Sequence, residues 1–80
     1  MYNEDMLVKA EVLSNGGTKI KLILKNGNTI NGFSIGIEPA FDEEGEELEY
    51  NVLIFDPENS DEYIQIKNEE IENVVVSLEY

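Results

Sequence analysis

Residues 19–33, KIKLILKNGNTINGF, decide the fold of this chain. Residues 19–25 alternate apolar side chains with side chains that are mostly lysine. This period of two is typical of a strand with one buried face and one largely cationic face. Asn26-Gly27 follows as a turn signal that supplies the left-handed backbone of a tight hairpin. Because the alternation resumes after the turn, the stretch predicts a β-hairpin.

The second strand of this hairpin changes its pattern partway along. Ile30 is even-numbered, whereas the apolar residues from Phe33 onward are odd-numbered, and Gly32 lies between them. One inserted residue moves the following side chains to the other face, and glycine tolerates the strained backbone. We therefore predict a bulge or sharp bend at Gly32. Pro39 predicts the end of the strand, because proline has no N–H to donate to a ladder.

The remaining elements predict a mainly β fold. Residues 3–13 have near-helical apolar spacing, with Asn3 as N-cap and Gly16-Gly17 as terminator, although valines leave a strand open as an alternative. Apolar alternation predicts further strands at 48–55, 63–67 and 74–80. In so short a chain, one helix and five antiparallel strands with short turns predict a single domain over residues 1–80, folded as a small, strongly bent SH3-like barrel.

Composition excludes most catalytic chemistry. The 80 residues contain no cysteine or histidine, and all five basic residues are lysines. Thiolate nucleophiles and Cys/His metal sites are therefore absent, and no histidine can activate a serine. Carboxylates in exposed loops have no apolar pocket to separate their pKa values into an acid and a base. We expect no enzyme, no cofactor and no metal site.

Composition also indicates that the chain folds and in which compartment we expect it. A hydrophobic content of 41% is too high for a disordered acidic tail. No cysteine is present for disulfide staples, and the chain does not open with a charged segment followed by an apolar run, which favours a cytoplasmic protein. No apolar stretch approaches the roughly 20 residues of a membrane span.

The net charge of -13 is unevenly divided along the chain. Residues 1–37 hold four lysines and three acidic residues, a net +1, whereas residues 38–80 hold fifteen acidic residues and one lysine, a net -14. The carboxylates of the second part gather in two predicted loops. The predicted acidic surface consists of Asp42, Glu43, Glu44, Glu46, Glu47, Asp56, Glu58, Asp61 and Glu62.

Three segments resemble the Sm/LSm family of small β-barrels. Residues 24–32 are similar to the strand, turn and bent strand of the first Sm motif, and residues 50–58 to its closing stretch. Residues 66–71 are similar to the second motif, with Lys67 at the family's arginine and Asn68 at its glycine. Judged by the order of elements, the resemblance covers roughly residues 5–78.

The resemblance implies a ring and an RNA site. Sm-like barrels assemble by pairing the fourth strand of one subunit with the fifth of the next, which implies homo-oligomers through residues 63–67 and 74–78. The family binds single-stranded RNA, often at uridines. Carried over by position, the ligand-binding residues are Asn51 and Lys67, with Asp42 as a match to the family's loop aspartate.

Charge limits the ligand that this fold could take. Affinity for a polyanion depends largely on basic side chains that displace counterions, so a net charge of -13 opposes a long strand. A short oligonucleotide or a mononucleotide needs fewer contacts. The leading hypothesis is a non-enzymatic, ring-forming Sm-like binding module for short single-stranded RNA or a nucleotide, with no membrane partner.

Two alternatives stay open. The acidic surface could imitate a phosphate backbone and occupy the groove of a basic nucleic-acid-binding protein, as small acidic inhibitors from phages and mobile elements do. Its charge could equally serve only solubility. An oligomer could also sequester a small nucleotide signal. Alternation assigns most of the aromatic residues to the core, which are Phe33, Phe41, Tyr50, Phe55 and Tyr63.

Overall fold

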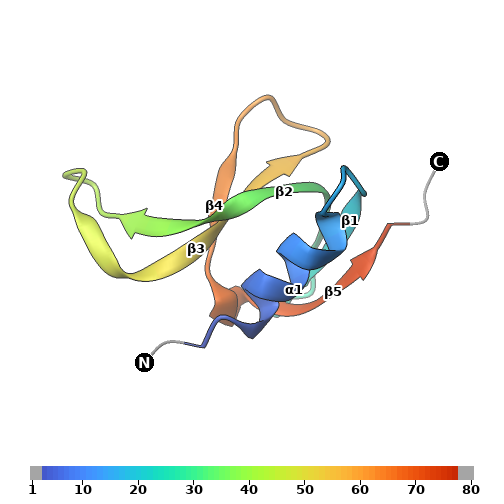
Figure 1. The fold of residues 1–80 in the computed structure, drawn as a ribbon, viewed down its shortest axis with the longest axis horizontal. Coiled ribbons are helices and arrows are strands. Elements are labelled where there is room, and N and C mark those ends of the chain that lie inside the picture. The colour runs from blue at the N-terminus through green and yellow to red at the C-terminus, as the bar shows by residue number, and fades with distance from the viewer. Residues whose placement is uncertain (1–2, 78–80) are drawn as a thin grey trace.

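A computed structural model describes residues 3–77 of the chain. It shows a short N-terminal helix followed by five strands, with one turn of 3-10 helix before the last strand (Figure 1). The elements are α1 (Asp5–Ser14), β1 (Ile20–Leu24), β2 (Thr29–Phe41), β3 (Glu47–Pro57), β4 (Ile64–Ile66), η1 (Asn68–Glu70) and β5 (Ile71–Val76).

The five strands form one antiparallel sheet in the order β4-β3-β2-β1-β5. The prediction of a mainly β fold with five antiparallel strands and an N-terminal helix is confirmed. Among the described residues no ladder joins β4 to β5, so both strands are edges and closure of a barrel is not confirmed. The last strand begins at Ile71 instead of Val74, and its predicted end at 78–80 lies outside the described residues.

The predicted hairpin is present, with a looser turn than expected. β1 and β2 are paired from Ile20↔Gly32 to Ile23↔Thr29. Within this turn, only Gly27 takes a positive φ, of 93°. Asn26 instead accepts a hydrogen bond from the Asn28 N–H through its side-chain oxygen, at 2.9 Å. The turn therefore closes through an Asx interaction together with one left-handed glycine.

Gly32 lies where β2 passes from one neighbour to the other. It is paired with Ile20 on β1 and with Pro57 on β3. A Cβ at this position would collide with the Asp56 carbonyl oxygen and lie 2.9 Å from the Pro57 Cα. The β2–β3 pairing shifts register further along, between Ser34 and Gly36 and again between Pro39 and Phe41. Close backbone approach, and not the bulge, is thus what requires glycine at position 32.

Pro39 does not end β2, which continues to Phe41, so that expectation is wrong. At this point β2 has β3 on one side, with Pro39 opposite Asn51, and its pairing with β1 has already ended at Gly32. Pro39 thus stands where β2 has a single neighbour and next to a register shift between Pro39 and Phe41, and edges and bulges are the places where a strand tolerates proline. The continued pairing carries the β2–β3 hairpin well beyond the rest of the molecule, at the left of Figure 1.

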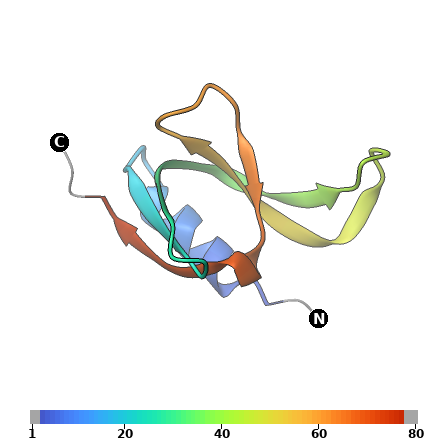
Figure 2. The same cartoon turned by 180° about the vertical axis from the view of Figure 1, so that it is seen from behind.

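Helix α1 packs across one side of the sheet, in front of it in Figure 1 and behind it in Figure 2. Leu7 and Ala10 are fully buried, whereas Val8 and Val12 are exposed. The helix thus buries one stripe against a core drawn from most of the strands. The core cluster is Leu7, Ala10, Ile20, Leu22, Leu53, Phe55, Ile66, Ile71 and Val74.

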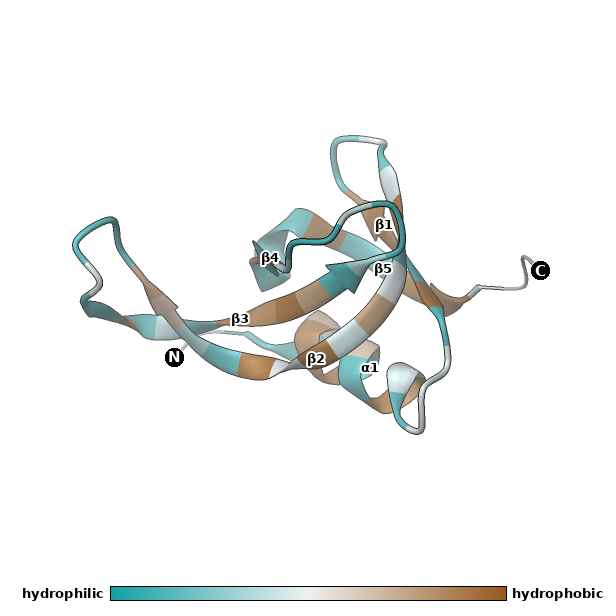
Figure 3. Ribbon diagram, turned by 90° about the horizontal axis from the view of Figure 1, so that it is seen from above, coloured by the Kyte–Doolittle hydropathy of each residue, from teal (hydrophilic) through white to brown (hydrophobic). Residues whose placement is uncertain are grey.

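The aromatic residues are mostly outside this core. Phe55 is fully buried, but Phe41 and Tyr63 are 50% and 62% exposed. Phe41 lies near the end of the long hairpin, where Figure 3 shows mainly hydrophilic residues and no further layer covers the strands. Assigning most of the aromatic residues to the core by alternation is therefore wrong.

The N-terminus of α1 is capped by a residue distant in sequence. The Asn68 side-chain oxygen accepts hydrogen bonds from the Met6 and Leu7 N–H groups at 2.8 and 3.2 Å, and its amide donates to Asp5 at 3.1 Å. The N-cap position belongs to Glu4, not to Asn3 as expected, and Asn3 accepts only the Asp5 N–H. Asn68 thereby fixes η1 against the helix.

Among residues 3–77, α1 is too short and too polar to cross a membrane, and no other helix is longer.

Replacing Gly32 by alanine should destabilise the protein by roughly 1–3 kcal/mol, because the added Cβ forces the β2 and β3 backbones apart. Thermal unfolding followed by circular dichroism measures the effect. Thr29→Ala, at an exposed position on the same strand, should change stability by less than about 0.5 kcal/mol. Equal stability of Gly32→Ala and wild type would show that the backbones are not in close contact.

Removing the Asn68 side chain should cost about 1–2 kcal/mol, because the Leu7 N–H loses its acceptor and the Met6 N–H keeps only the Asp5 carboxylate, at 2.9 Å. Asn68→Ala is compared by chemical denaturation with Asn73→Ala, whose side chain accepts only from the exposed Lys9 ammonium at 2.7 Å. Asn73→Ala should lie within about 0.5 kcal/mol of wild type. Similar losses in both variants would argue against a special capping role for Asn68.

Candidate functional site

One surface pocket brings together two of the three ligand-binding residues predicted from the sequence. Its volume is about 350 Å³, and both Asn51 and Lys67 line it. They come from β3 and from the residue before η1, so elements distant in sequence build the site. The full lining consists of Asn3, Lys25, Tyr50, Asn51, Lys67, Asn68 and Glu69.

The connection between β4 and β5 positions Lys67. The Glu70 side chain accepts the Lys67 N–H at 3.3 Å, and the Glu70 N–H donates to the Lys67 carbonyl at 3.0 Å. The Glu70 carbonyl accepts the Lys25 N–H at 3.0 Å, which places the β1–β2 turn against η1. Two lysines that lie 42 positions apart in the sequence therefore face one pocket.

Tyr50 and Asn51 reach the pocket from an open part of β3. At this level β3 has β2 on one side, with Asn51 opposite Pro39, and its pairing with β4 begins only at Leu53. Consecutive side chains on a strand point to opposite faces, but an open edge lets both flank the same depression. The Lys67 Nζ lies 5.5 Å from the centre of the Tyr50 ring, within the range of a cation–π contact.

The pocket differs in charge from the chain as a whole. Its lining holds two lysines and one carboxylate, that of Glu69, in a protein of net charge -13. The other lysines have different contacts. Lys19 forms an ion pair with Glu58 at 3.0 Å, and Lys9 donates to Asn73. The pocket lining thus holds one more lysine than carboxylate, together with an aromatic ring and three side-chain amides.

Asp42 does not line this pocket. It begins the loop of the long hairpin, and its carboxylate accepts the Glu44 and Glu46 N–H groups, each at 2.9 Å. The Gly45 N–H donates to its carbonyl, and Gly45 has a φ of 82°. The carboxylate of Asp42 therefore orders its own loop.

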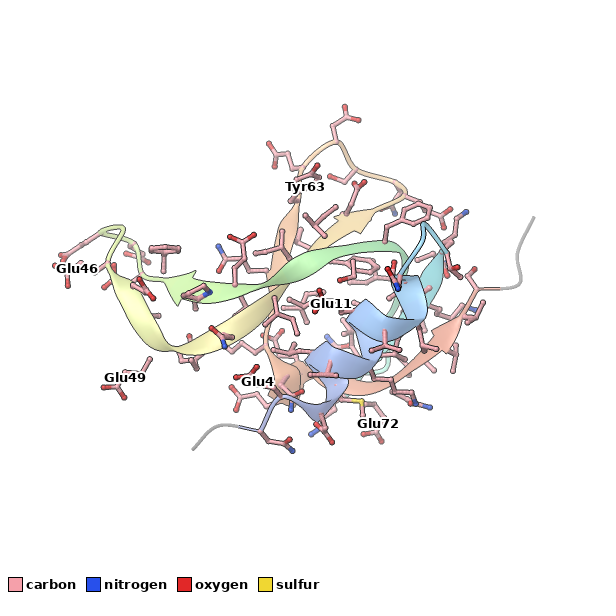
Figure 4. All side chains as sticks on the ribbon, in the orientation of Figure 1. Glu4, Glu11, Glu46, Glu49, Tyr63 and Glu72 are labelled. Atoms are coloured by element: carbon pink, nitrogen blue, oxygen red, sulfur yellow. The ribbon has the colours of Figure 1, made fainter. Side chains whose placement is uncertain are left out.

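The predicted acidic surface is divided between two places. Residues 42–47 form the tip of the hairpin, where Figure 4 shows Glu46, whereas residues 58–62 form the β3–β4 connection, beside the labelled Tyr63. Asp56 is partly buried at the end of β3, and Glu58 is held by Lys19. The nine carboxylates thus do not form one continuous surface. Within residues 3–77, no group of three or more side chains has the arrangement of a metal site.

Sequence reasoning missed several residues of the pocket. The sequence predicts Lys25 on the largely cationic face of a strand and Tyr50 in the core, yet both line the site. Tyr50 and Asn68 are the immediate neighbours of Asn51 and Lys67, so proximity in the sequence was the available signal. Asn3 carries no such signal, because only the folded helix brings it to the strands.

Comparison with protein-family models, with curated proteins and with solved structures finds no match for this chain. The resemblance to Sm-like barrels thus rests on the three motif segments, and it stays a prediction.

Proposed function

We propose that this protein is a non-enzymatic Sm-like binding module that self-associates into a ring and holds a short single-stranded RNA or a nucleotide. The ligand would occupy the pocket around Asn51 and Lys67. The observation that carries the proposal is the convergence of a lysine ammonium, an aromatic ring and an amide in one pocket.

Each part of this arrangement suits one part of a nucleotide. A base could stack on the Tyr50 ring in place of the Lys67 ammonium, and stacking on an aromatic side chain is tolerant of base identity. The amide of Asn51 can donate to and accept from the edge of a base. Lys67 and Lys25 can contact phosphate as point charges, although a lysine lacks the planar fork of an arginine.

The same charges set the size of the ligand. Each phosphate beyond the pocket would meet a chain with eighteen acidic residues and three lysines outside the pocket lining. Repulsion therefore grows with strand length, whereas the favourable contacts do not. This balance favours a nucleotide or a few linked nucleotides over a long RNA.

The pocket is a better candidate for function than the acidic surface. A decoy of a phosphate backbone needs carboxylates along one continuous line, whereas these lie at the hairpin tip and at a separate connection. One of them is already paired with Lys19 and another orders its own loop. We therefore prefer the nucleotide-binding proposal.

Self-association is the second part of the proposal. β4 and β5 each have one neighbour in the sheet, so their outer backbone groups are open to pairing among the described residues. Tyr63, just before β4, and Val76, at the end of β5, are 62% and 40% exposed. Pairing β4 of one subunit with β5 of the next would cover both edges and enlarge a small core.

Binding should depend on Lys67 and Asn51. Fluorescence anisotropy with a labelled uridine hexanucleotide at low salt should show affinity that falls roughly five- to thirtyfold in Lys67→Ala and in Asn51→Ala, from loss of a charged contact or a base hydrogen bond. Lys9→Ala, which removes the same charge from α1, is the matched control and should change affinity less than about twofold. Equal losses in Lys9→Ala and Lys67→Ala would mean that overall charge, and not the pocket, binds RNA.

Self-association should depend on the sheet edges. Light scattering should show an oligomer for the wild type and a smaller species for Val76→Lys, because a charge would be buried between β4 and β5. Val8→Lys alters an apolar side chain of similar exposure, 50%, on the outer face of α1, and should leave the oligomer intact. A wild-type protein that remains a monomer at high concentration would refute the ring.

A further inference from the structure

Glu4 makes a contact that its position in the helix does not explain. It is the N-cap residue of α1, where an acidic side chain ordinarily accepts hydrogen bonds from the first free amides. The Glu4 side chain makes no such bond. The Met6 and Leu7 N–H groups are bonded to Asn68 instead.

The Glu4 carboxylate is directed toward the pocket residue Asn51. Its Oε2 atom accepts a hydrogen bond from the Asn51 side-chain amide at 3.1 Å, across 47 positions of sequence. Figure 4 shows Glu4 at the start of α1, on the side facing β3. The neighbouring residue Asn3 lines the pocket itself. The beginning of the helix therefore borders the site.

We propose that Glu4 is a built-in competitor that weakens anionic ligands at this pocket and selects among them, an inference that rests on the proposed function. Two effects follow from one carboxylate. It occupies a donor of Asn51 through a charge-assisted hydrogen bond, which is stronger than a bond to a neutral carbonyl. It also repels any phosphate group that approaches Asn51.

The geometry determines which ligands are selected. The Glu4 carboxylate is hydrogen-bonded to the Asn51 side chain, whereas the ammonium group of Lys67 lies over the Tyr50 ring. A ligand whose phosphates stay beside the lysines avoids most of the repulsion. A ligand that places a phosphate beside Asn51 is repelled by the full charge of the Glu4 carboxylate. Glu4 therefore discriminates by the position of the phosphate and lowers affinity for all ligands that need the Asn51 donor.

Asn68 allows Glu4 to move without releasing the helix. Because Asn68 supplies the hydrogen-bond acceptor for the first amides of α1, displacement of the Glu4 side chain by a ligand leaves the helix capped. The competing contact can therefore be lost and regained while the fold stays intact. Substitutions at Glu4 should consequently fold normally, which makes the inference open to direct test.

The test compares Glu4→Ala, Glu4→Gln and Glu11→Gln for binding of the labelled uridine hexanucleotide. Glu4→Ala should bind roughly five- to tenfold more tightly than wild type, because both the competing acceptor and the charge are gone. Glu4→Gln should lie between them, since glutamine keeps an acceptor without the charge. Glu11→Gln makes the same charge change on an exposed part of α1, and should match wild type within about twofold.

A second measurement reports the contact without ligand. In a nitrogen-15 correlation spectrum, the Asn51 side-chain amide signals should shift in Glu4→Ala and remain in place in Glu11→Gln. If the wild type binds and Glu4→Ala binds equally well, the competitor is refuted while the proposed function stands. If Glu11→Gln gains as much as Glu4→Gln, general charge explains the effect and the inference fails. If neither wild type nor Glu4→Ala binds, the proposed function fails, and the inference with it.

Discussion

Asn68 occupies the point where the helix, the end of the sheet and the pocket meet. Its side-chain oxygen accepts two amides of α1, and its amide donates to Asp5. The same residue begins η1, which connects the two edge strands and lines the pocket. A helix of ten residues is too short to be stable alone, so its position depends on tertiary contacts such as this one. It holds the start of α1, where Asn3 and Glu4 lie, against η1 beside the pocket.

The acidic and basic side chains are unevenly distributed over the fold. Eight of the eighteen carboxylates lie on the hairpin tip at 42–47 and on the β3–β4 connection at 58–62, whereas the pocket lining that contains Lys25 and Lys67 holds one carboxylate, that of Glu69. A net charge of -13 therefore coexists with a pocket whose lining holds more lysines than carboxylates. For an anionic ligand, the net charge of the protein would be repulsive and the pocket lysines attractive. The Glu4 carboxylate, hydrogen-bonded to Asn51, would add a repulsion within the pocket. The proposed function is therefore binding of a short ligand, with an affinity that these carboxylates restrain.

Periodicity and turn residues predicted the strands, because alternation reports directly on which face is buried. Alternation could not locate the bulge near Ile35. The apolar positions change from even-numbered to odd-numbered residues after Ile30, and a bulge at Gly32 explains that change equally well. Pro39 misled because its cost depends on whether the strand has a neighbour on that side. Asn51 and Lys67 were predicted to share a site, but the roles of Asn68 and Glu4 depend on contacts across 62 and 47 positions, which no local pattern contains. Tyr50 precedes Asn51, so the sequence could have placed it at the site. Its apolar alternation predicted a core position instead.

The most direct test of the central claim is a titration of the nitrogen-15-labelled protein with an unlabelled uridine hexanucleotide, followed by nuclear magnetic resonance. The account predicts that the largest shifts occur in the side-chain amide of Asn51 and in the backbone amides of Lys25, Tyr50 and Lys67. The hairpin tip at residues 42–47 should stay unchanged, because its carboxylates repel phosphate. Shifts spread over all five lysines, or no shifts at the pocket at saturating ligand, would contradict it.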